Sequence, residues 1–382
     1  MIYLFFPILI LSIFLVLITY ILPPTYLFRS KDGNLKIGSF HNLSNKPNHI
    51  LYLLLKNSNL TWKTSHNQWD IFIPGIHDYR SCRKINNIKI TTPTQKIMGV
   101  AGKWNLGSKK KLWNNLLQYH GLKKTLRIMP MTFSLPEDLN ILVDRMKGVN
   151  KKKEIFVIKK DRQRQNGLIL TDDWKKIKNI NHHYVIAQKF IPNSYLYQGY
   201  RISLRYYLLV ILQDNNKSFW IHPLGIVTYA NTKFHPNKGE VNFNNSVASF
   251  YTSQNKYKSG FPISLNNFYQ DIGIDKGLEI WAQVRGLARM VSLAVKDKMG
   301  GHNFELGNQS FELFGMDFLI DQNFNTRLIE INVGPGMIPF GQIDKDIRKK
   351  VYIDMFDKVQ VINNENNMMG ENQFRLLANF EN

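Results

Sequence analysis

The feature that most restricts this chain is a pair of adjacent apolar strands that carry acidic side chains. The segments 312–320 and 328–332 are rich in Leu, Ile and Phe, and a polar turn joins them. Alternate side chains of a strand share one face, so Glu330 and Asn332 point the same way, and Asp317 can join them from the neighbouring strand. Oxygen groups among apolar residues are costly unless something satisfies them, and Mg²⁺ does so with carboxylates, waters and phosphate oxygens. The alternative is a polar sheet edge that faces water.

A second group of candidate residues lies where the apolar strand 155–158 ends in two lysines. Lys159, at the strand end, can reach a phosphate as a point charge. The loop that follows, 162–167, offers backbone donors and ends in a glycine. The alternative is a basic hairpin turn on an already basic protein.

A third group occupies two further strand-like segments, 185–191 and 199–205. An edge strand with an aromatic residue can present backbone groups to an adenine while apolar side chains cover its faces. Arg201 and Arg205 fall on one face of a strand and suit a ribose, a phosphate or a developing anionic intermediate. The alternative is an ordinary strand whose arginines pair with acids.

The order of these motifs resembles the tubulin–tyrosine ligase-like family, a branch of the ATP-grasp ligases. The blocks that carry the resemblance are Gln188 to Ile191, Phe311 to Phe318 and Leu328 to Asn332, with weaker matches at Ser108-Lys109 and Pro130 to Pro136. The resemblance covers about residues 95–345. It implies an α+β ATP-grasp fold, with antiparallel-rich sheets, flanking helices and a nucleotide cleft between lobes.

The resemblance also implies ATP and Mg²⁺ as cofactors and assigns residues to them. Asp317, Glu330 and Asn332 look like the magnesium ligands, while Lys159 and Arg205 stand where charge on the transferred phosphoryl group is stabilised. Together with Glu330 they form the implied catalytic set. The implied nucleotide-binding residues are Lys159, Asn166, Gly167, Gln188, Lys189, Phe190, Ile191, Arg201, Ser203, Asn244 and Asn245.

The implied reaction is ATP-dependent amide-bond formation. A protein carboxylate attacks the γ-phosphate to give an acylphosphate, and the amino group of a free amino acid then displaces phosphate. Two departures from the family pattern stand out: Ser203 stands where the family usually has Asp, and the family places an arginine near position 228, where this chain reads Gly225 to Thr228 without one. These departures leave open an alternative, a catalytically impaired pseudoenzyme that acts as a membrane-tethered binder of acidic proteins or microtubules.

The first 28 residues carry no charged side chain. About 20 apolar residues suffice for one membrane-spanning helix, so we expect a single-pass anchor at residues 1–28. A cleaved signal peptide is the rival interpretation, but it requires a basic n-region and a small-x-small cleavage site, which this segment lacks. Basic residues follow the span at Arg29, Lys31 and Lys36, which predicts that the rest of the chain is cytosolic.

Shifts in composition divide the remainder of the chain. We expect a mixed N-terminal lobe at 29–130, a central ATP-grasp lobe at 131–212, a C-terminal lobe with the metal site at 213–362 and a polar tail at 363–382. Within them we expect helices at 108–119, where Gly121 ends the helix, at 137–146 and at 278–298. The single cysteine, Cys82, excludes an internal disulfide framework.

The chain is strongly basic, with 50 Lys and Arg against 28 Asp and Glu and a net charge of +22. A basic surface steers acidic partners toward a site. Since the family modifies acidic tubulin tails, the resemblance implies an acidic protein tail, such as that of tubulin, and a free amino acid as partners of a monomer. Basic clusters at 109–111, 151–153 and 348–350 are candidates for the route. Contact with an anionic membrane and a merely solvated surface are alternatives, and no motif indicates nucleic acid.

Overall fold

The structure is a computed structural model. It describes residues 37–38, 49, 51, 53–54, 69–74, 90–148, 154–161, 167–213, 216–234, 241–300, 308–361 and 371–381. The expected anchor at 1–28 lies outside these ranges. Within them, no helix is both long and apolar enough to cross a membrane.

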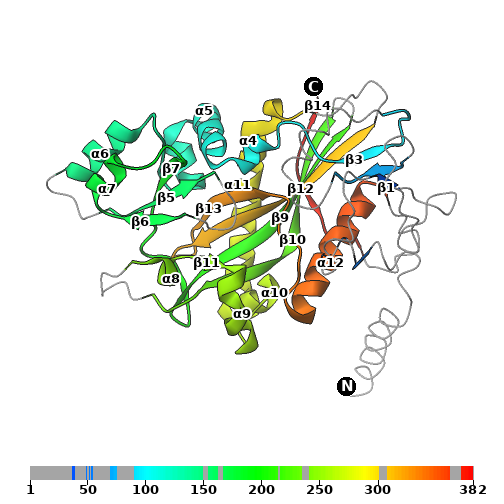
Figure 1. The fold of residues 1–382 in the computed structure, drawn as a ribbon. Helices are drawn as coiled ribbons and strands as arrows, with labels where there is room; N and C mark the ends of the chain where they lie inside the picture. The colour runs from blue at the N-terminus through cyan, green and yellow to red at the C-terminus, as the bar shows by residue number, and fades with distance from the viewer. Residues whose placement is uncertain are drawn as a thin grey trace, which may run out of the picture.

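A ten-stranded sheet forms the body of the molecule (Figure 1). Its long central strands are antiparallel: β9 (Tyr200–Gln213) pairs with β10 (Asn216–Ala230) on one side and with β12 (Gln309–Ile320) on the other. β13 (Thr326–Val333) pairs with β12 across the expected polar turn. The shorter strands are β1 (Ile37–Gly38), β2 (Ile71–Phe72), β3 (Lys96–Met98), β8 (Leu196–Tyr197), β11 (Ala248–Ser249) and β14 (Arg375–Glu381).

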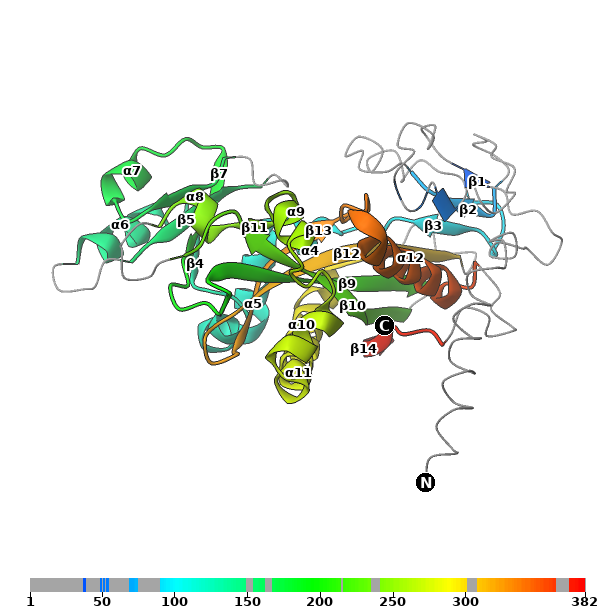
Figure 2. The same cartoon turned by 90° about the horizontal axis from the view of Figure 1, so that it is seen from below.

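The two faces of the large sheet are covered by different helices. The helices of the first face are α4 (Trp104–Gly107), α5 (Lys109–Ile128), α10 (Leu265–Ile272) and α11 (Ile274–Val295). Figure 2 shows α10 and α11 on one side and α12 (Gly341–Lys358) on the other. Even-numbered residues of β9 such as Leu208 pack in the core beneath α4, α5, α10 and α11. Odd-numbered residues such as Leu209 pack with α12. This period-2 alternation places Arg201, Ser203 and Arg205 on the same side of β9 as Leu209.

Helix α5 begins as the sequence predicts, because the Ser108 side chain accepts a hydrogen bond from the Lys111 backbone N–H at 3.4 Å. The prediction that Gly121 ends this first helical segment is confirmed, because its backbone is not helical, although the range of α5 includes a second segment beyond it. Gly121 has a φ of 71° and makes a kink, after which helical structure resumes to Ile128. A glycine with positive φ interrupts a helix without preventing a second helical segment from following it.

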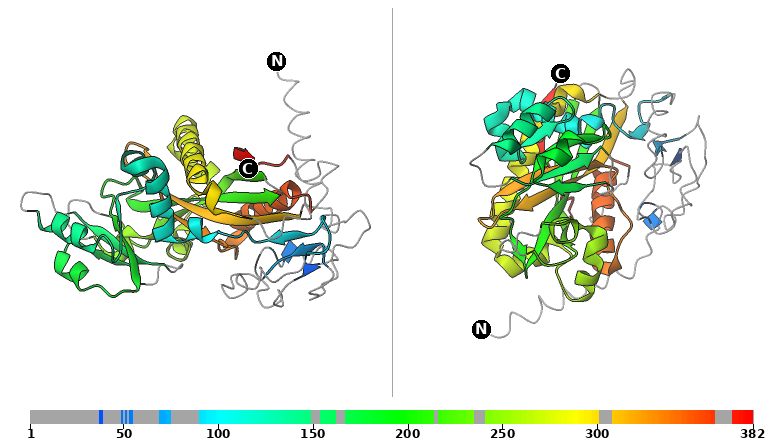
Figure 3. Two further views of the ribbon diagram at one scale, coloured as in Figure 1. Left: turned by 90° about the horizontal axis from the view of Figure 1, so that it is seen from above. Right: turned by 60° about the vertical axis from the view of Figure 1, so that its left-hand side comes forward.

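A separate four-stranded antiparallel sheet lies at one end of the molecule, opposite β1 to β3 (Figure 3). Its strand order is β4 (Thr132–Ser134), β7 (Tyr184–Lys189), β5 (Phe156–Lys160) and β6 (Ile169–Thr171). Two helices, α6 (Leu139–Lys147) and α7 (Trp174–Lys178), contribute Leu142 and Ile177 to its core. The mixed α/β architecture with antiparallel-rich sheets is therefore confirmed.

The expected lobe boundaries differ from the sheet boundaries at two places. The small sheet ends at Lys189, whereas the central lobe was expected to reach residue 212; β9 belongs to the large sheet because it pairs along its length with β10 and β12. The expectation of a polar tail is wrong for residues 375–381, which form β14 and pair with β10.

Two neighbouring leucines of β14 provide a test of how this strand packs against the large sheet. Leu377 is 8% exposed and packs in the main core, while Leu376 is 46% exposed. We expect Leu377→Ala to lower the free energy of unfolding by about 2–3 kcal/mol, because it leaves a cavity, and Leu376→Ala to lower it by less than about 1 kcal/mol. Urea unfolding of both variants measures the difference, and equal losses would contradict the packing of β14.

Candidate active site

A pocket lies where the small sheet meets the large one. Strands β5, β6 and β7 line one wall, and β9, residues 246–248, β12 and β13 line the other. The predicted site residues in this lining are Lys159, Gln188, Lys189, Phe190, Ile191, Arg201, Ser203, Asp317 and Glu330. Of the others, Gly167 is described but is not part of the lining, and Asn166 lies outside the described residues.

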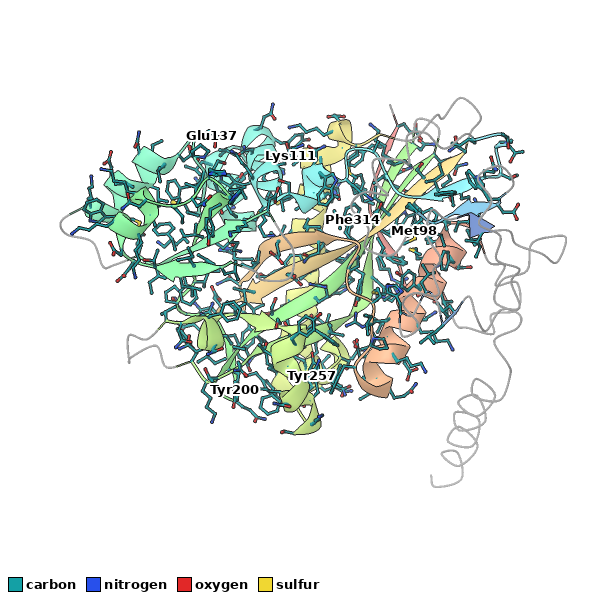
Figure 4. The ribbon with its side chains drawn as sticks, viewed as in Figure 1. Met98, Lys111, Glu137, Tyr200, Tyr257 and Phe314 are labelled. Atoms are coloured by element: carbon teal, nitrogen blue, oxygen red, sulfur yellow. The ribbon has the colours of Figure 1, made fainter. Side chains whose placement is uncertain are left out.

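The three expected oxygen donors converge. Asp317 of β12 lies directly opposite Glu330 of β13 in the strand register. The Asn332 side-chain amide donates to Asp317 Oδ2 at 2.9 Å and to Glu330 Oε1 at 3.2 Å. Phe314, earlier on β12, is fully buried at the centre of the molecule (Figure 4). An apolar core thus supports one end of the strand that presents Asp317.

The donor set suits a hard cation. In the described part of the chain, no three His, Cys, Asp or Glu side chains gather into a metal-binding cluster. Two carboxylates and an amide, with room for phosphate and water oxygens, match the ligands of Mg²⁺ rather than those of Zn²⁺. Metal binding at Asp317, Glu330 and Asn332 stays a prediction.

Each carboxylate of this group already faces a cation. Arg205 donates from Nε to Asp317 Oδ1 at 2.5 Å and from Nη2 to Asp317 Oδ2 at 2.7 Å. Lys109 Nζ lies 3.4 Å from Glu330 Oε2. Burial would raise the pKa of Glu330, but Lys109 and Lys159 outweigh it and lower the pKa to about 2. Burial raises the pKa of Asp317, and Arg205 opposes that rise.

Lys109 is a site residue that sequence reasoning missed. We placed it in a surface cluster, 109–111, but it is buried and lines the pocket. It is the first residue of α5, and its backbone N–H donates to Asp161 Oδ1 at 2.9 Å, just after β5. The available signal was the Ser108 cap, which fixes where the helix begins and therefore where Lys109 projects.

Lys159 meets the expectation of a lysine that faces the pocket from a strand end. Its ammonium donates to the neutral Gln188 Oε1 at 2.7 Å, and no carboxylate among the described residues forms a salt bridge with it. Burial lowers the pKa of Lys159 to about 8, and Glu330 partly opposes this. A desolvated cation held by a neutral amide is well suited to receive an anionic ligand.

Arg201 is a second buried cation of the pocket wall. Its side chain is 1% exposed and stacks over the rings of Phe190 and Phe234, at 4.2 and 5.1 Å from their centroids. Nη1 donates to the Ile191 carbonyl at 2.7 Å, so Arg201 supports the strand expected to meet the adenine. Burial lowers the pKa of Arg201 to about 9.

The family of this chain follows from a comparison with known proteins. Residues 88–368 match the Tubulin-tyrosine ligase family. The chain belongs to this family. The resemblance inferred from the motifs is therefore confirmed, and the mixed α/β architecture fits the ATP-grasp-like fold of tubulin–tyrosine ligases.

The chain is similar to several curated members of the family. A probable beta-tubulin polyglutamylase of Tetrahymena thermophila is 23% identical over 287 residues, which cover 69% of this chain and 24% of that protein. A tubulin monoglutamylase of Mus musculus is 21% identical over 314 residues, covering 74% and 24%. A tubulin polyglutamylase of Mus musculus is 25% identical over 294 residues, covering 70% and 34%. The matched part thus spans only a quarter to a third of these relatives.

Two positions carried over from the family pattern do different work in this tubulin–tyrosine ligase family member. Asn245 forms a reciprocal capping box with Asn242 at the start of α8 (Phe243–Ser246), and the pocket is lined by residues 246–248 instead of Asn244 and Asn245. The Asn245 side-chain oxygen is thus engaged in the cap, and phosphate binding by Asn244 and Asn245 stays a prediction.

The Lys189 ammonium is also engaged elsewhere. It donates to Glu154 Oε1 at 2.6 Å, and Arg145 holds the same carboxylate at 2.7 and 2.9 Å. Gln188 and Lys189 are consecutive strand residues, so their side chains leave opposite faces of β7. Lys189 therefore contributes its backbone and stem to the lining, and its charge to a structural ion pair.

This ion pair predicts how stability depends on pH. The Arg145 hydrogen bond, with Lys189, lowers the pKa of Glu154 from 4.5 to about 2 despite burial. The stabilisation is therefore present above pH 4.5 and is lost as pH falls toward 2. We expect Glu154→Gln to cost about 1 kcal/mol at pH 7 and to flatten this acid dependence in urea unfolding.

Glu137→Gln is the matched control, because the Glu137 side chain is 60% exposed at its salt bridge with Lys110 (Figure 4). A Glu154→Gln variant with the same acid dependence as wild type would exclude this role.

Proposed function

We propose that this chain is an ATP- and Mg²⁺-dependent ligase that joins an amino acid to a protein carboxylate through an acylphosphate. The observation that carries the proposal is the composition of one pocket. Asp317 and Glu330 line it together with the cations Lys109 and Lys159, beside the end of β7. Asn332 and Arg205 are outside the lining and hydrogen-bond to Asp317.

The chain's own residues supply positioning and charge. Residues 188–191 line the pocket, and Arg201 fixes the Ile191 carbonyl of that segment. The expectation of an edge strand is wrong, because β7 pairs with both β4 and β5, and the N–H groups of Lys189 and Phe190 donate to the Met131 and Ile155 carbonyls. We therefore place the adenine against the end of β7, where the strand pairing stops. Lys109 and Lys159 neutralise the triphosphate in a site with little water, where such contacts are strong. Bound Mg²⁺ would be held by Asp317, Glu330 and Asn332 and would neutralise phosphate oxygens. No covalent enzyme intermediate is required, since orientation of the reactants supplies much of the acceleration.

We also propose an acidic protein tail, of the kind tubulin carries, as the acceptor. The support is the charge of +22 and the printed names of the relatives, which are tubulin polyglutamylases and monoglutamylases. Part of the expected basic route is already neutralised, however. Arg348 is buried against Asp344 at 2.6 Å, and Lys350 pairs with Asp354 at 2.7 Å. Residues 151–153 lie outside the described ranges.

The pseudoenzyme alternative rests on Ser203 and Thr228. These residues lie directly opposite each other in the β9–β10 register, and Thr228 Oγ1 donates to the Ser203 carbonyl at 3.3 Å. Both hydroxyl side chains are therefore accommodated within the sheet, and Thr228 is not part of the pocket lining. Because the oxygen donors and lysines are also present, the ligase is the better supported function.

The decisive test uses the full chain with ATP, Mg²⁺, tubulin and single radiolabelled amino acids. We expect incorporation of one amino acid, and a loss of at least about 100-fold in Glu330→Gln, because an oxyanion or metal contact of this kind contributes that much to rate. Glu279→Gln, on the exposed surface of α11, is the matched control. ATP binding without incorporation into any acceptor would support the binder instead.

The lowered pKa of Lys159 predicts a pH dependence of nucleotide binding. The ammonium, with a pKa of about 8, attracts phosphate below that pH and loses its charge as the pH rises above it. We expect the affinity for Mg²⁺ with a non-hydrolysable ATP analogue to weaken between pH 8 and pH 9.5 (about one to one and a half units above this pKa) in wild type. Lys159→Arg should bind without this decline, since a guanidinium stays charged. Identical titration calorimetry profiles for the two proteins would refute the assignment.

We further propose that residues 1–28 tether the ligase to a membrane with the remainder in the cytosol. The support is the uncharged apolar segment and the basic residues after it.

A further inference from the structure

Arg205 occupies both carboxylate oxygens of Asp317, which is one of the predicted metal ligands. The two residues are register partners on β9 and β12, and both nitrogens of the guanidinium fork reach the two carboxylate oxygens. Their side chains are 21% and 16% exposed, so water weakens the pair only partly. Planar two-point pairing is the strongest form of a charge-assisted hydrogen bond.

The remaining carboxylate oxygens of the group are occupied as well. Asp317 Oδ2 also accepts from the Asn332 amide at 2.9 Å. Glu330 Oε1 accepts from the same amide at 3.2 Å, and Oε2 faces Lys109 at 3.4 Å. Asp317 thus accepts three hydrogen bonds, two of them from Arg205, so a cation that binds Asp317 competes with Arg205.

The charges of the group decide when that displacement is favourable. Three cations, Lys109, Lys159 and Arg205, surround two carboxylates, so the group carries one excess positive charge. A metal ion arriving alone meets this positive field and must break the Arg205 pair without offering Arg205 a new partner. A polyphosphate supplies oxygen acceptors for Arg205 and the lysines, which frees Asp317.

We propose that Arg205 makes metal binding conditional on a polyphosphate: it holds Asp317 in the ligand-free protein and releases it only when phosphate oxygens replace the carboxylate. Arg205 is in this sense a positioning residue for the metal. The inference rests on the proposed function, because it takes the pocket to be a metal-nucleotide site. Gly315 gives the guanidinium its space, since a Cβ there would lie 3.1 Å from Arg205 Cδ and Nη1.

The test measures metal affinity without nucleotide, using Mn²⁺ as the probe and the full chain at pH 7. Free Mn²⁺ is quantified by electron paramagnetic resonance. We expect weak binding to wild type, at least tenfold tighter binding to Arg205→Gln, and a smaller gain for Arg205→Lys, which keeps the charge but loses the fork. Arg145→Gln is the matched control, because Arg145 makes the same two-point contact with Glu154 outside the pocket.

Unchanged or weaker Mn²⁺ binding by Arg205→Gln overturns the proposal. If that variant does not fold, as judged by circular dichroism, Arg205→Lys decides in the same way. The gain must also vanish in Arg205→Gln/Asp317→Asn, and a gain that survives would place the ion elsewhere and refute the proposal. If wild type incorporates an amino acid but the Arg205 variants show no gain in Mn²⁺ affinity, the proposed ligase function is retained and only this inference is refuted.

Discussion

The register of β12 between its two neighbours is the constraint on which the site depends. Asp317 lies opposite Arg205 on β9 and opposite Glu330 on β13, so one residue receives charged neighbours from both sides. A slip of one residue in either pairing would turn Asp317 to the apolar face. The pairing with β13 is irregular directly after Asp317, at Phe318. Such a bulge re-aims neighbouring side chains, and here it adds Ile329 to the pocket wall.

The same alternation explains how a charged pocket coexists with a large core. Leu204 and Tyr206 of β9 are fully buried in the core covered by α5, α10 and α11. On the other face of the strand, Ser203 lines the pocket, and Arg205 contacts the pocket residue Asp317. Farther along the strand, odd-numbered residues such as Leu209 are covered by α12. One face of β9 therefore packs in the core along the strand. The other face contributes to the site near the start of the strand and packs in a second core farther along.

The sequence predicts the parts of the site that local pattern controls. Asp317, Glu330 and Asn332 could be grouped because the period of a strand decides which side chains share a face, and Lys159 because a strand end is visible in sequence. The ion pairs of Lys109 and Lys189 could not be predicted from the sequence for one reason: which partner a lysine meets depends on distant segments. Glu330 lies far along the chain from Lys109, and Glu154 precedes the strand that holds Lys189. The pairing of β14 with β10 is likewise long-range and leaves no local signal.

The departures at Ser203 and Thr228 show why a substitution should be judged by its neighbour in the sheet. Considered separately, each departure lacks a charged side chain of the family pattern, and each suggests a loss of catalytic activity. In the strand register, Ser203 and Thr228 lie opposite each other. If only the serine were present, an arginine opposite it would be a buried cation without a partner. If only the threonine were present, an acid opposite it would be a buried anion without a partner. Both arrangements are costly in a partly desolvated site. Two hydroxyl groups avoid both costs: Ser203 donates to the Phe318 carbonyl at 3.2 Å and Thr228 to the Ser203 carbonyl. Both hydroxyl groups are therefore satisfied inside the sheet, and the two residues are compatible with a site that keeps its structure.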